Sequence, residues 1–248
     1  KIIEHPSTDT LEFQANYMCQ HLMLQVTQQC NLRCEYCAYS GMYDNRVHSN
    51  KRMDFKLAKK AIDFFINHSR ESKSITLGFY GGEPLLEFSL IKQCIEYIEN
   101  QVEGKEIHYA ITTNGTLLND EIGDYFVKHN VSLAISLDGS KKEHDLHRRF
   151  RNGTGSFDVI MRNIKRIKER HPEYGRDIIF VPVVTPNASL AHVIEYFTTD
   201  ELLKEHMKLY NPISENGKKK ELEKKETYDE LDFRMVQDFE YIKLLLFL

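Results

Sequence analysis

The sequence lacks the features that direct a protein to a membrane or to a polyanion. No apolar run reaches the roughly 18 residues that a membrane-spanning helix needs, and the first residues, KIIEHPSTDT, lack the basic-then-apolar pattern of a secretory signal. The formal net charge of -4 gives no general attraction to nucleic acid or to an anionic membrane surface. No internal repeat is visible that would support a solenoid. We therefore expect a cytoplasmic protein that binds neither nucleic acid nor a membrane.

Cysteine is scarce and unevenly placed. Of the five cysteines, Cys30, Cys34 and Cys37 lie close together, and none follows Cys94. An odd number with three so close together suits metal ligation in a reducing compartment better than a disulfide framework. Cys94 stands apart on the apolar face of an expected helix, where we predict that it packs in the core.

The composition favours one globular domain with flanking segments. The 248 residues are 41% hydrophobic and 28% charged, a balance that can bury a sizeable core. The chain begins at Lys1 rather than Met and ends on KLLLFL, which favours a fragment of a longer protein. The composition shifts at GKKKELEKKE, so we place a boundary near residue 216. The expected parts are an N-terminal extension at 1–20, an αβ domain at 21–216, and a helical tail or linker at 217–248.

Strand and helix patterns alternate along the chain. Each of the first four strand patterns is followed by apolar residues at helical spacing, and IIFVPVVT is an unbroken apolar run, typical of a parallel strand covered on both faces. Such repeats imply right-handed crossovers and a parallel sheet, either open or curled into a barrel with too few strands to close at eight. The expected strands lie at residues 21–26, 74–80, 107–113, 132–137, 178–185 and 207–213.

The cysteine segment CNLRCEYC, residues 30–37, follows the end of the first expected strand. Its cysteines fall at i, i+4 and i+7, so they could line one face of a helix as small core residues. The polar neighbours Asn31, Arg33 and Glu35 argue against a buried helix. A loop after a strand is also where αβ folds place ligand-bearing residues.

Three metal interpretations remain open for these cysteines. A structural zinc site needs a fourth ligand, for which His21 or His48 is available. An electron-transfer iron-sulfur protein normally surrounds each cluster with four cysteines, and Cys19 could serve as the fourth. Three thiolates on a four-iron cluster instead leave one iron with an open position, where a substrate or cofactor can bind. An incomplete ligand set of this kind indicates chemistry.

The cysteine segment resembles the CxxxCxxC pattern of the radical S-adenosylmethionine (SAM) family, with the aromatic residue Tyr36 just before the last cysteine. The resemblance implies that Cys30, Cys34 and Cys37 hold a [4Fe-4S] cluster, and that the amino and carboxylate groups of SAM bind the open iron. It also implies that an electron from the cluster cleaves SAM to a 5′-deoxyadenosyl radical. The expected fold is then a partial (β/α)6 TIM-like barrel of parallel strands, followed by a helical C-terminal tail.

Further segments at strand ends extend the resemblance into a SAM pocket. GGEP, TTNGT, SLDG, HDLHRRF and VVTP each follow or close an expected strand, although each also has a simpler explanation as a turn, a solvated surface or a core position. The resemblance assigns GGE to the SAM ammonium, the HDxxR arginine to a carboxylate, and the VVTP valine to adenine. The cofactor-binding residues that it implies are Tyr36, Gly81, Gly82, Glu83, Asn114, Ser136, Arg148 and Val184.

The combination of motifs over roughly residues 20–213 resembles the peptide-maturase (SPASM-type) branch of the family. That branch includes anaerobic sulfatase maturases and the thioether-forming maturases of sactipeptide and ranthipeptide synthesis. It implies a precursor peptide as substrate, a thioether crosslink to a peptide cysteine as product, and an external electron donor such as flavodoxin or ferredoxin. Oxidation of a sulfatase cysteine or serine, radical chemistry on a small molecule, and a non-catalytic iron-sulfur or zinc module are the alternatives.

The branch usually carries auxiliary clusters in a cysteine-rich C-terminal extension, and no cysteine here follows Cys94. The residues shown therefore cannot build those clusters in the usual way. The catalytic base stays unassigned.

Overall fold

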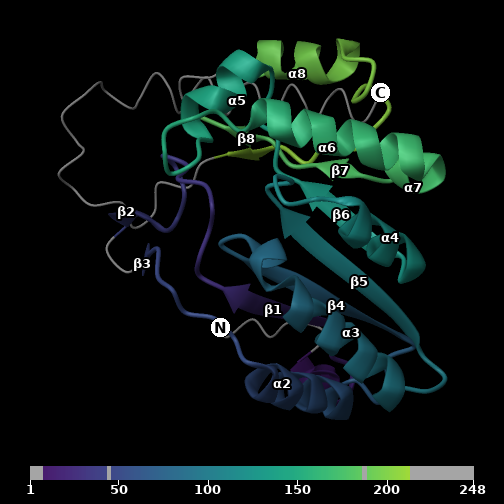
Figure 1. The fold of residues 1–248 in the computed structure, drawn as a ribbon. Helices are drawn as coiled ribbons and strands as arrows, with labels where there is room; N and C mark the ends of the chain where they lie inside the picture. The colour runs from purple at the N-terminus through teal and green to yellow at the C-terminus, as the bar shows by residue number, and fades with distance from the viewer. Residues whose placement is uncertain (1–7, 44–45, 186–188, 213–248) are drawn as a thin grey trace, which may run out of the picture. The chain divides into compact units, whose positions relative to one another are not determined.

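A computed structural model describes residues 8–43, 46–185 and 189–212 (Figure 1). These described residues fall into two compact units, the first within the ranges 1–31, 49–135 and 160–178, and the second within the ranges 32–48, 136–159 and 179–248. No helix within the described ranges combines the length and the apolar character that spanning a bilayer requires. The expected boundary near 216 and the tail at 217–248 lie outside the described residues.

The first unit is built on a parallel sheet. Its strands β1 (His21–Thr27), β4 (Ser74–Gly81), β5 (Glu106–Thr113) and β6 (Val131–Ile135) pair in the order β1-β4-β5-β6. These are the first four expected strands, so the prediction of parallel strands is confirmed here. Buried apolar side chains on every strand, among them Val26, Leu77, Ile111 and Leu133, form its core.

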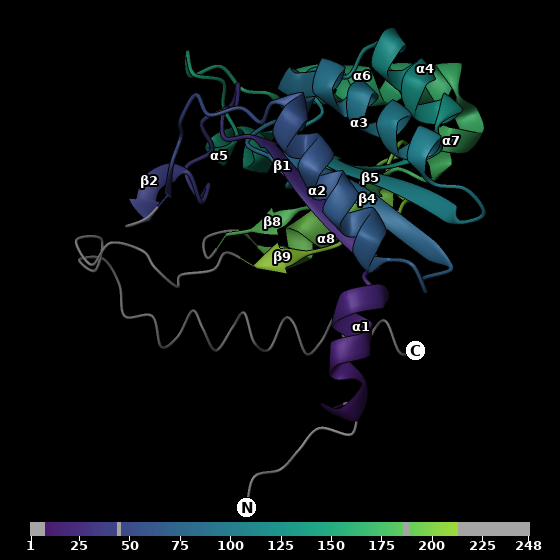
Figure 2. The ribbon, with the colours of Figure 1, turned by 90° about the horizontal axis from the view of Figure 1, so that it is seen from below.

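Helices follow these strands as the periodicity predicts. The first unit contains α2 (Phe55–His68), α3 (Phe88–Gln101), α4 (Asp120–Lys128) and most of α6 (Phe157–Arg170), which match predicted helices. It also contains two short helices that the periodicity does not predict, α1 (Leu11–Tyr17) and α7 (Pro172–Arg176). Asp54 caps α2 by accepting the Leu57 N–H at 2.7 Å, and Asn119 caps α4 in the same way. Figure 2 shows α2 and α3 side by side, and Cys94 of α3 is fully buried, which confirms its core role.

The second unit has short strands. It contains an antiparallel pair, β2 (Ser40–Tyr43) and β3 (Arg46–Val47), then β7 (Ile179–Phe180), β8 (Val183–Val184) and β9 (Asn211–Pro212), with β8 parallel to β9. The prediction of one continuous strand at 178–185 is wrong, because this segment forms two short strands, β7 and β8. Pro182 stands at the break, where it lacks the N–H that a strand ladder needs.

Two helices complete the second unit. One, α8 (Leu190–Thr199), is capped by Ser189, which accepts the His192 N–H, and its Phe197 packs against Phe180. The other, α5 (Lys141–His147), lies in a stretch that the sequence predicts as loop. Ser140 and Glu143 form a capping box at its start, which explains why so short and polar a segment is helical.

Candidate functional site

The backbone that leads into Cys30 packs against the two glycines at the end of β4. Gly82 N donates to Thr27 O at 2.9 Å, and Glu83 N donates to Gln29 O at 2.9 Å. A Cβ on Gly81 would overlap the carbonyl oxygen of Thr27, and one on Gly82 would overlap that of Gln29. Both glycines are therefore needed for close approach of two backbones. Their predicted contact with SAM stays a prediction.

Glu83 is fully buried and ties two strand-end loops together. Its Oε1 accepts from Leu85 N at 3.0 Å and from Thr113 Oγ1 at 2.6 Å, while its Oε2 accepts from Asn114 N at 2.7 Å. Three donors compensate the cost of burying the carboxylate. Glu83 thus fixes the TTNGT loop after β5 to the GGEP loop after β4, and its predicted contact with the SAM ammonium remains untested.

Asn114, which the sequence places near SAM, lies against the cysteine segment. Its Nδ2 is 2.8 Å from Asn31 Oδ1 and 3.7 Å from Cys30 Sγ, and its Oδ1 accepts from Thr116 N at 3.0 Å. The loops after β1 and β5 are therefore joined by side chains at the carboxyl edge of the first unit's sheet. This edge is where ligands bind in αβ folds.

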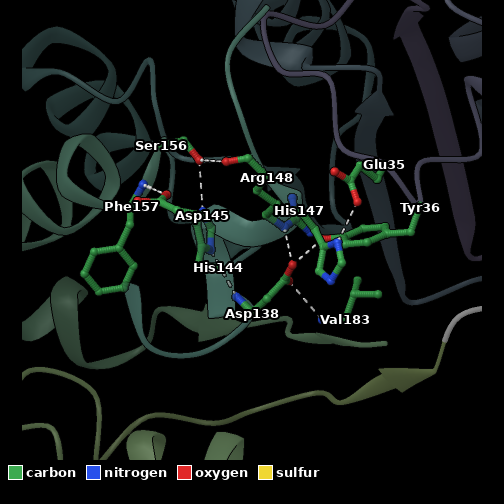
Figure 3. Close-up of polar contacts among 10 residues, drawn as sticks. All are labelled: Glu35, Tyr36, Asp138, His144, Asp145, His147, Arg148, Ser156, Phe157 and Val183. Carbon is green, nitrogen blue, oxygen red and sulfur yellow. Dashed lines mark hydrogen bonds and ion pairs between the residues drawn. The ribbon is translucent and has the colours of Figure 1, made fainter. Parts of the chain in front are cut away.

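In the second unit, Asp138 is the centre of a buried polar group (Figure 3). Its Oδ2 accepts from Tyr36 OH and from Arg148 Nε, the latter at 2.9 Å, and its Oδ1 accepts from Val183 N at 3.0 Å. Arg148 also lies over the Tyr36 ring, 5.4 Å from the centroid. Asp138 joins the cysteine segment to the loop after β6 and to β8. The motifs assign Asp138 no role, although an acidic residue directly after the strand expected at 132–137 is an available signal.

Burial sets the protonation of these groups. It raises the pKa of the Tyr36 hydroxyl well above its ordinary value, so Tyr36 stays a donor to Asp138. Burial tends to lower the pKa of Arg148, but the neighbouring Asp138 carboxylate has the larger effect and holds this pKa well above its ordinary value. The guanidinium therefore stays charged. The Arg148 guanidinium forms an internal ion pair with Asp138, and its contact with a SAM carboxylate stays a prediction.

A second chain of hydrogen bonds supports the same residues. Asp138 N donates to His144 Nδ1 at 3.2 Å, His144 Nε2 lies 2.9 Å from Ser156 Oγ, and Ser156 Oγ donates to Arg148 O at 2.9 Å. A backbone N–H can only donate, so the His144 proton sits on Nε2. Burial, together with the nearby charge of Arg148, lowers the pKa of His144 to about 4, and the ring is neutral.

The cysteine segment is also held by main-chain bonds within the second unit. Arg33 N donates to Arg149 O at 2.7 Å, and Glu35 N donates to His147 O at 3.2 Å. The Glu35 carboxylate lies 3.0 Å from His147 Nδ1 (Figure 3). These contacts fix the backbone on both sides of Cys34.

The sulfur environments fit an iron-sulfur cluster. None of the three cysteines forms a disulfide with another described cysteine, and all three are of intermediate exposure. Cys37 Sγ accepts from Tyr39 N at 3.4 Å and Cys30 Sγ accepts from Asn114, and such N–H donors stabilise thiolate ligands. Burial raises the pKa of Cys34 to about 11, so metal binding has to displace its proton.

No three His, Cys, Asp or Glu side chains within the described ranges are grouped as a single metal ion would require. A four-iron cluster makes a different demand, because each thiolate binds its own iron. Of the other predicted residues, Ser136 is half-buried directly after β6, and Val184 is buried in β8. Nothing in their surroundings tests a SAM contact.

Comparison with known proteins matches this site to a family. Residues 24–198 match the model of the Radical SAM superfamily. An uncharacterized protein of Methanocaldococcus jannaschii is 35% identical over 71% of this chain and 57% of its own length. A cysteine-type anaerobic sulfatase-maturating enzyme of Clostridium novyi is 33% identical over 68% of this chain and 44% of its length. A serine-type anaerobic sulfatase-maturating enzyme of Bacteroides thetaiotaomicron is 35% identical over 58% of this chain and 35% of its own length. The chain therefore spans only part of each of these relatives.

Solved structures agree on the fold. The protein anSMEcpe with bound AdoMet matches with a TM-score of 0.69 and 22% identity, covering 91% of this chain and 62% of that chain. The same protein with bound AdoMet and a peptide matches with a TM-score of 0.65 and 21% identity, covering 79% of this chain and 51% of that chain. The expected α/β partial barrel is thereby confirmed. With the family match over residues 24–198, these findings place the chain in the radical SAM superfamily, whose members use a [4Fe-4S] cluster and SAM.

Proposed function

We propose that this chain is the catalytic barrel of a radical SAM enzyme that modifies a peptide. The observation that carries the proposal is the contact between Cys30, which emerges beyond the end of β1, and the Asn114 amide, which follows β5. It puts an N–H donor next to the Cys30 sulfur, at the carboxyl edge of the sheet, where αβ folds bind ligands. The sulfatase-maturating relatives, at 33% and 35% identity, support a peptide substrate.

Within this proposal, Cys30, Cys34 and Cys37 hold the cluster, and the other residues shape its surroundings. The cluster and SAM, when bound, supply a 5′-deoxyadenosyl radical that removes a hydrogen atom from the substrate. Gly81, Gly82, Glu83, Ser136 and Val184 are the proposed SAM contacts. Asp138 orients Tyr36 and Arg148, both of which we also propose as contacts.

Two products are candidates. One is a thioether that joins a peptide cysteine sulfur to a carbon, with loss of two hydrogens. The other is oxidation of a single cysteine or serine, which the names of the sulfatase-maturating relatives favour. In either reaction one hydrogen atom leaves to the 5′-deoxyadenosyl radical, while the second electron passes to an oxidised electron carrier and its proton to solvent. A one-electron reductant has to start the reaction, and flavodoxin or ferredoxin is the proposed partner. Chemistry on a small molecule is the remaining enzymatic alternative.

The test is anaerobic reconstitution of the full chain with iron and sulfide, followed by SAM and dithionite. We expect about four iron and four sulfide per chain and release of 5′-deoxyadenosine. The triple variant of Cys30, Cys34 and Cys37 to Ala should release none, whereas Cys19→Ala should behave as the parent. If the chain holds an intact cluster but releases no 5′-deoxyadenosine, the proposal that it is a radical SAM enzyme is refuted.

Cysteine-containing precursor peptides then separate the products. Tandem mass spectrometry after thiol alkylation distinguishes a crosslink between two residues from oxidation at one residue. A peptide that is never altered, while 5′-deoxyadenosine accumulates, would favour a small-molecule substrate. Zinc without iron or acid-labile sulfide would favour a non-catalytic binding module.

A further inference from the structure

Three polar side chains next to Cys30 form a closed ring of hydrogen bonds. Thr116 Oγ1 donates to Asn114 Oδ1 at 2.6 Å, Asn114 Nδ2 donates to Asn31 Oδ1 at 2.8 Å, and Asn31 Nδ2 donates to Thr116 Oγ1 at 2.8 Å. The backbone N–H of Thr116 also donates to Asn114 Oδ1, at 3.0 Å. Because a backbone N–H cannot accept, this bond fixes which end of the Asn114 amide is oxygen. The Nδ2 group therefore faces the cysteine segment.

The Asn114 amide has a second hydrogen to donate. One hydrogen of Nδ2 goes to Asn31 Oδ1, and the nitrogen lies 3.7 Å from Cys30 Sγ, a hydrogen-bonding distance for the larger sulfur atom. Asn114 is 6% exposed, so water competes little for this hydrogen. The ring thus leaves one N–H of a buried amide directed at a sulfur that the family uses as a cluster ligand.

The loop that carries Asn114 is fixed from several sides. Glu83 Oε2 accepts its backbone N–H at 2.7 Å, and Asn163 Nδ2 donates to the carbonyls of Gly115 and Thr116 at 3.0 and 3.1 Å. Gly115 has a φ of +75°, which favours glycine, and a Cβ there would press on Ile135. The amide is therefore positioned before any cofactor binds.

We infer that Asn114 is a positioning residue that sets the reduction potential of the cluster through an N–H···S bond to the Cys30 thiolate. The inference rests on the proposed cluster at the three cysteines. Reduction adds one negative charge that is shared with the ligand sulfurs, so a donor to sulfur stabilises the reduced cluster more than the oxidised one. Asn114 thereby makes the reduction that precedes SAM cleavage easier.

The test is a redox titration of the reconstituted full chain, followed by electron paramagnetic resonance (EPR) in the absence of SAM. Asn114→Ala removes the donor. Asn114→Asp keeps the oxygen that accepts from Thr116 and replaces the donor with a second oxygen. Thr116→Val is the matched control, because it opens the same ring but leaves the Asn114 amide next to Cys30.

At a fixed potential, we expect both Asn114 variants to lower the ratio of reduced to oxidised cluster by roughly tenfold, equal to about 59 mV for a one-electron couple. The Thr116→Val protein should stay close to the parent. An unchanged potential in both Asn114 variants would overturn the inference and leave the proposed function intact. Loss of the cluster from both, with retention in Thr116→Val, would also overturn it by making Asn114 purely structural. If the unmodified chain assembles no cluster, the result contradicts the proposed function rather than the role of Asn114.

Discussion

Asp138 and Arg148 form an ion pair in which Arg148 Nε lies 2.9 Å from Asp138 Oδ2, with both side chains almost completely buried. The same carboxylate oxygen accepts from Tyr36, which stands between two of the cysteines. A buried carboxylate with donors on both oxygens keeps its charge only while those donors are present. The pair therefore links the stability of the second unit to the position of the cysteine segment.

Removal of either partner should be costly. Asp138→Ala leaves the Arg148 guanidinium buried without its counter-charge, and we expect a loss of roughly 3–5 kcal/mol in the free energy of unfolding. Denaturant titration measures the loss. Glu169→Gln removes an exposed ion pair with Lys165 and should change stability little, as surface pairs do. Equal small effects from both variants would contradict the role given to Asp138.

His144 should make the protein sensitive to acid. Its folded pKa of about 4 lies below the ordinary value of 6.5, because burial and the charge of Arg148 oppose protonation, while Asp138 and Asp145 partly offset them. The unfolded chain therefore binds more protons between pH 6.5 and 4. The contribution of the neutral His144 ring to the free energy of unfolding is complete above pH 6.5. It falls by about 3 kcal/mol as the pH drops through this window, and it does not change further below pH 4.

The His144→Gln variant isolates that contribution. Both proteins lose carboxylate interactions in acid, so the difference between their unfolding free energies at pH 7 and pH 4 reports His144 alone. The parent should lose more stability than the variant over this range. Parallel curves would mean that His144 is not a buried neutral ring.

Gly155, the second glycine of the segment NGTGSF at residues 152–157, has a packing role that a matched pair of variants can show. A Cβ on Gly155 would overlap the Asp145 carboxylate, which accepts the Phe157 N–H at 2.9 Å at the start of α6. Gly155→Ala should destabilise the protein by about 1–3 kcal/mol. Gly123 lies inside α4, and a Cβ there makes only ordinary contact with Ile167 of α6. Gly123→Ala should therefore stabilise the protein by about 0.5–1 kcal/mol. Thermal melting measures both changes: the melting temperature should fall in Gly155→Ala and rise in Gly123→Ala. A shift in the same direction for both variants would contradict the packing role of Gly155.

Gly82 is predicted to control cluster assembly through the backbone. An alanine there displaces Gln29 and with it the turn into Cys30. We expect Gly82→Ala to retain a folded circular dichroism spectrum but to hold at most half of the iron and acid-labile sulfide of the parent after reconstitution. Full cluster content would show that the close approach of Gly82 and Gln29 is not required.

The sequence could predict features that depend on local patterns. Four strands and their helices follow from apolar periodicity, and Cys94 is identified as core by its place on a helix face. Apolar periodicity does not predict the helix at Lys141–His147, because that segment is short and polar and only its capping box marks a helix start. Pro182 indicates the division of the strand at 178–185, although the apolar run favours a single strand.

The side-chain contacts of the site could not be predicted in the same way. Tyr36 pairs with Asp138 across 102 positions, and Asn114 meets Cys30 across 84. Such pairs depend on the register of the strands and on the course of each loop. Motifs placed these residues at strand ends, but only coordinates show which donor meets which acceptor.

The proposed function depends most on a four-iron cluster that three protein thiolates hold. Mössbauer spectroscopy of the full chain reconstituted with 57Fe tests this most directly. One iron of the four should differ from the other three, and its isomer shift should change when SAM is added. Four equivalent irons that do not respond to SAM would contradict a cluster held by three protein thiolates.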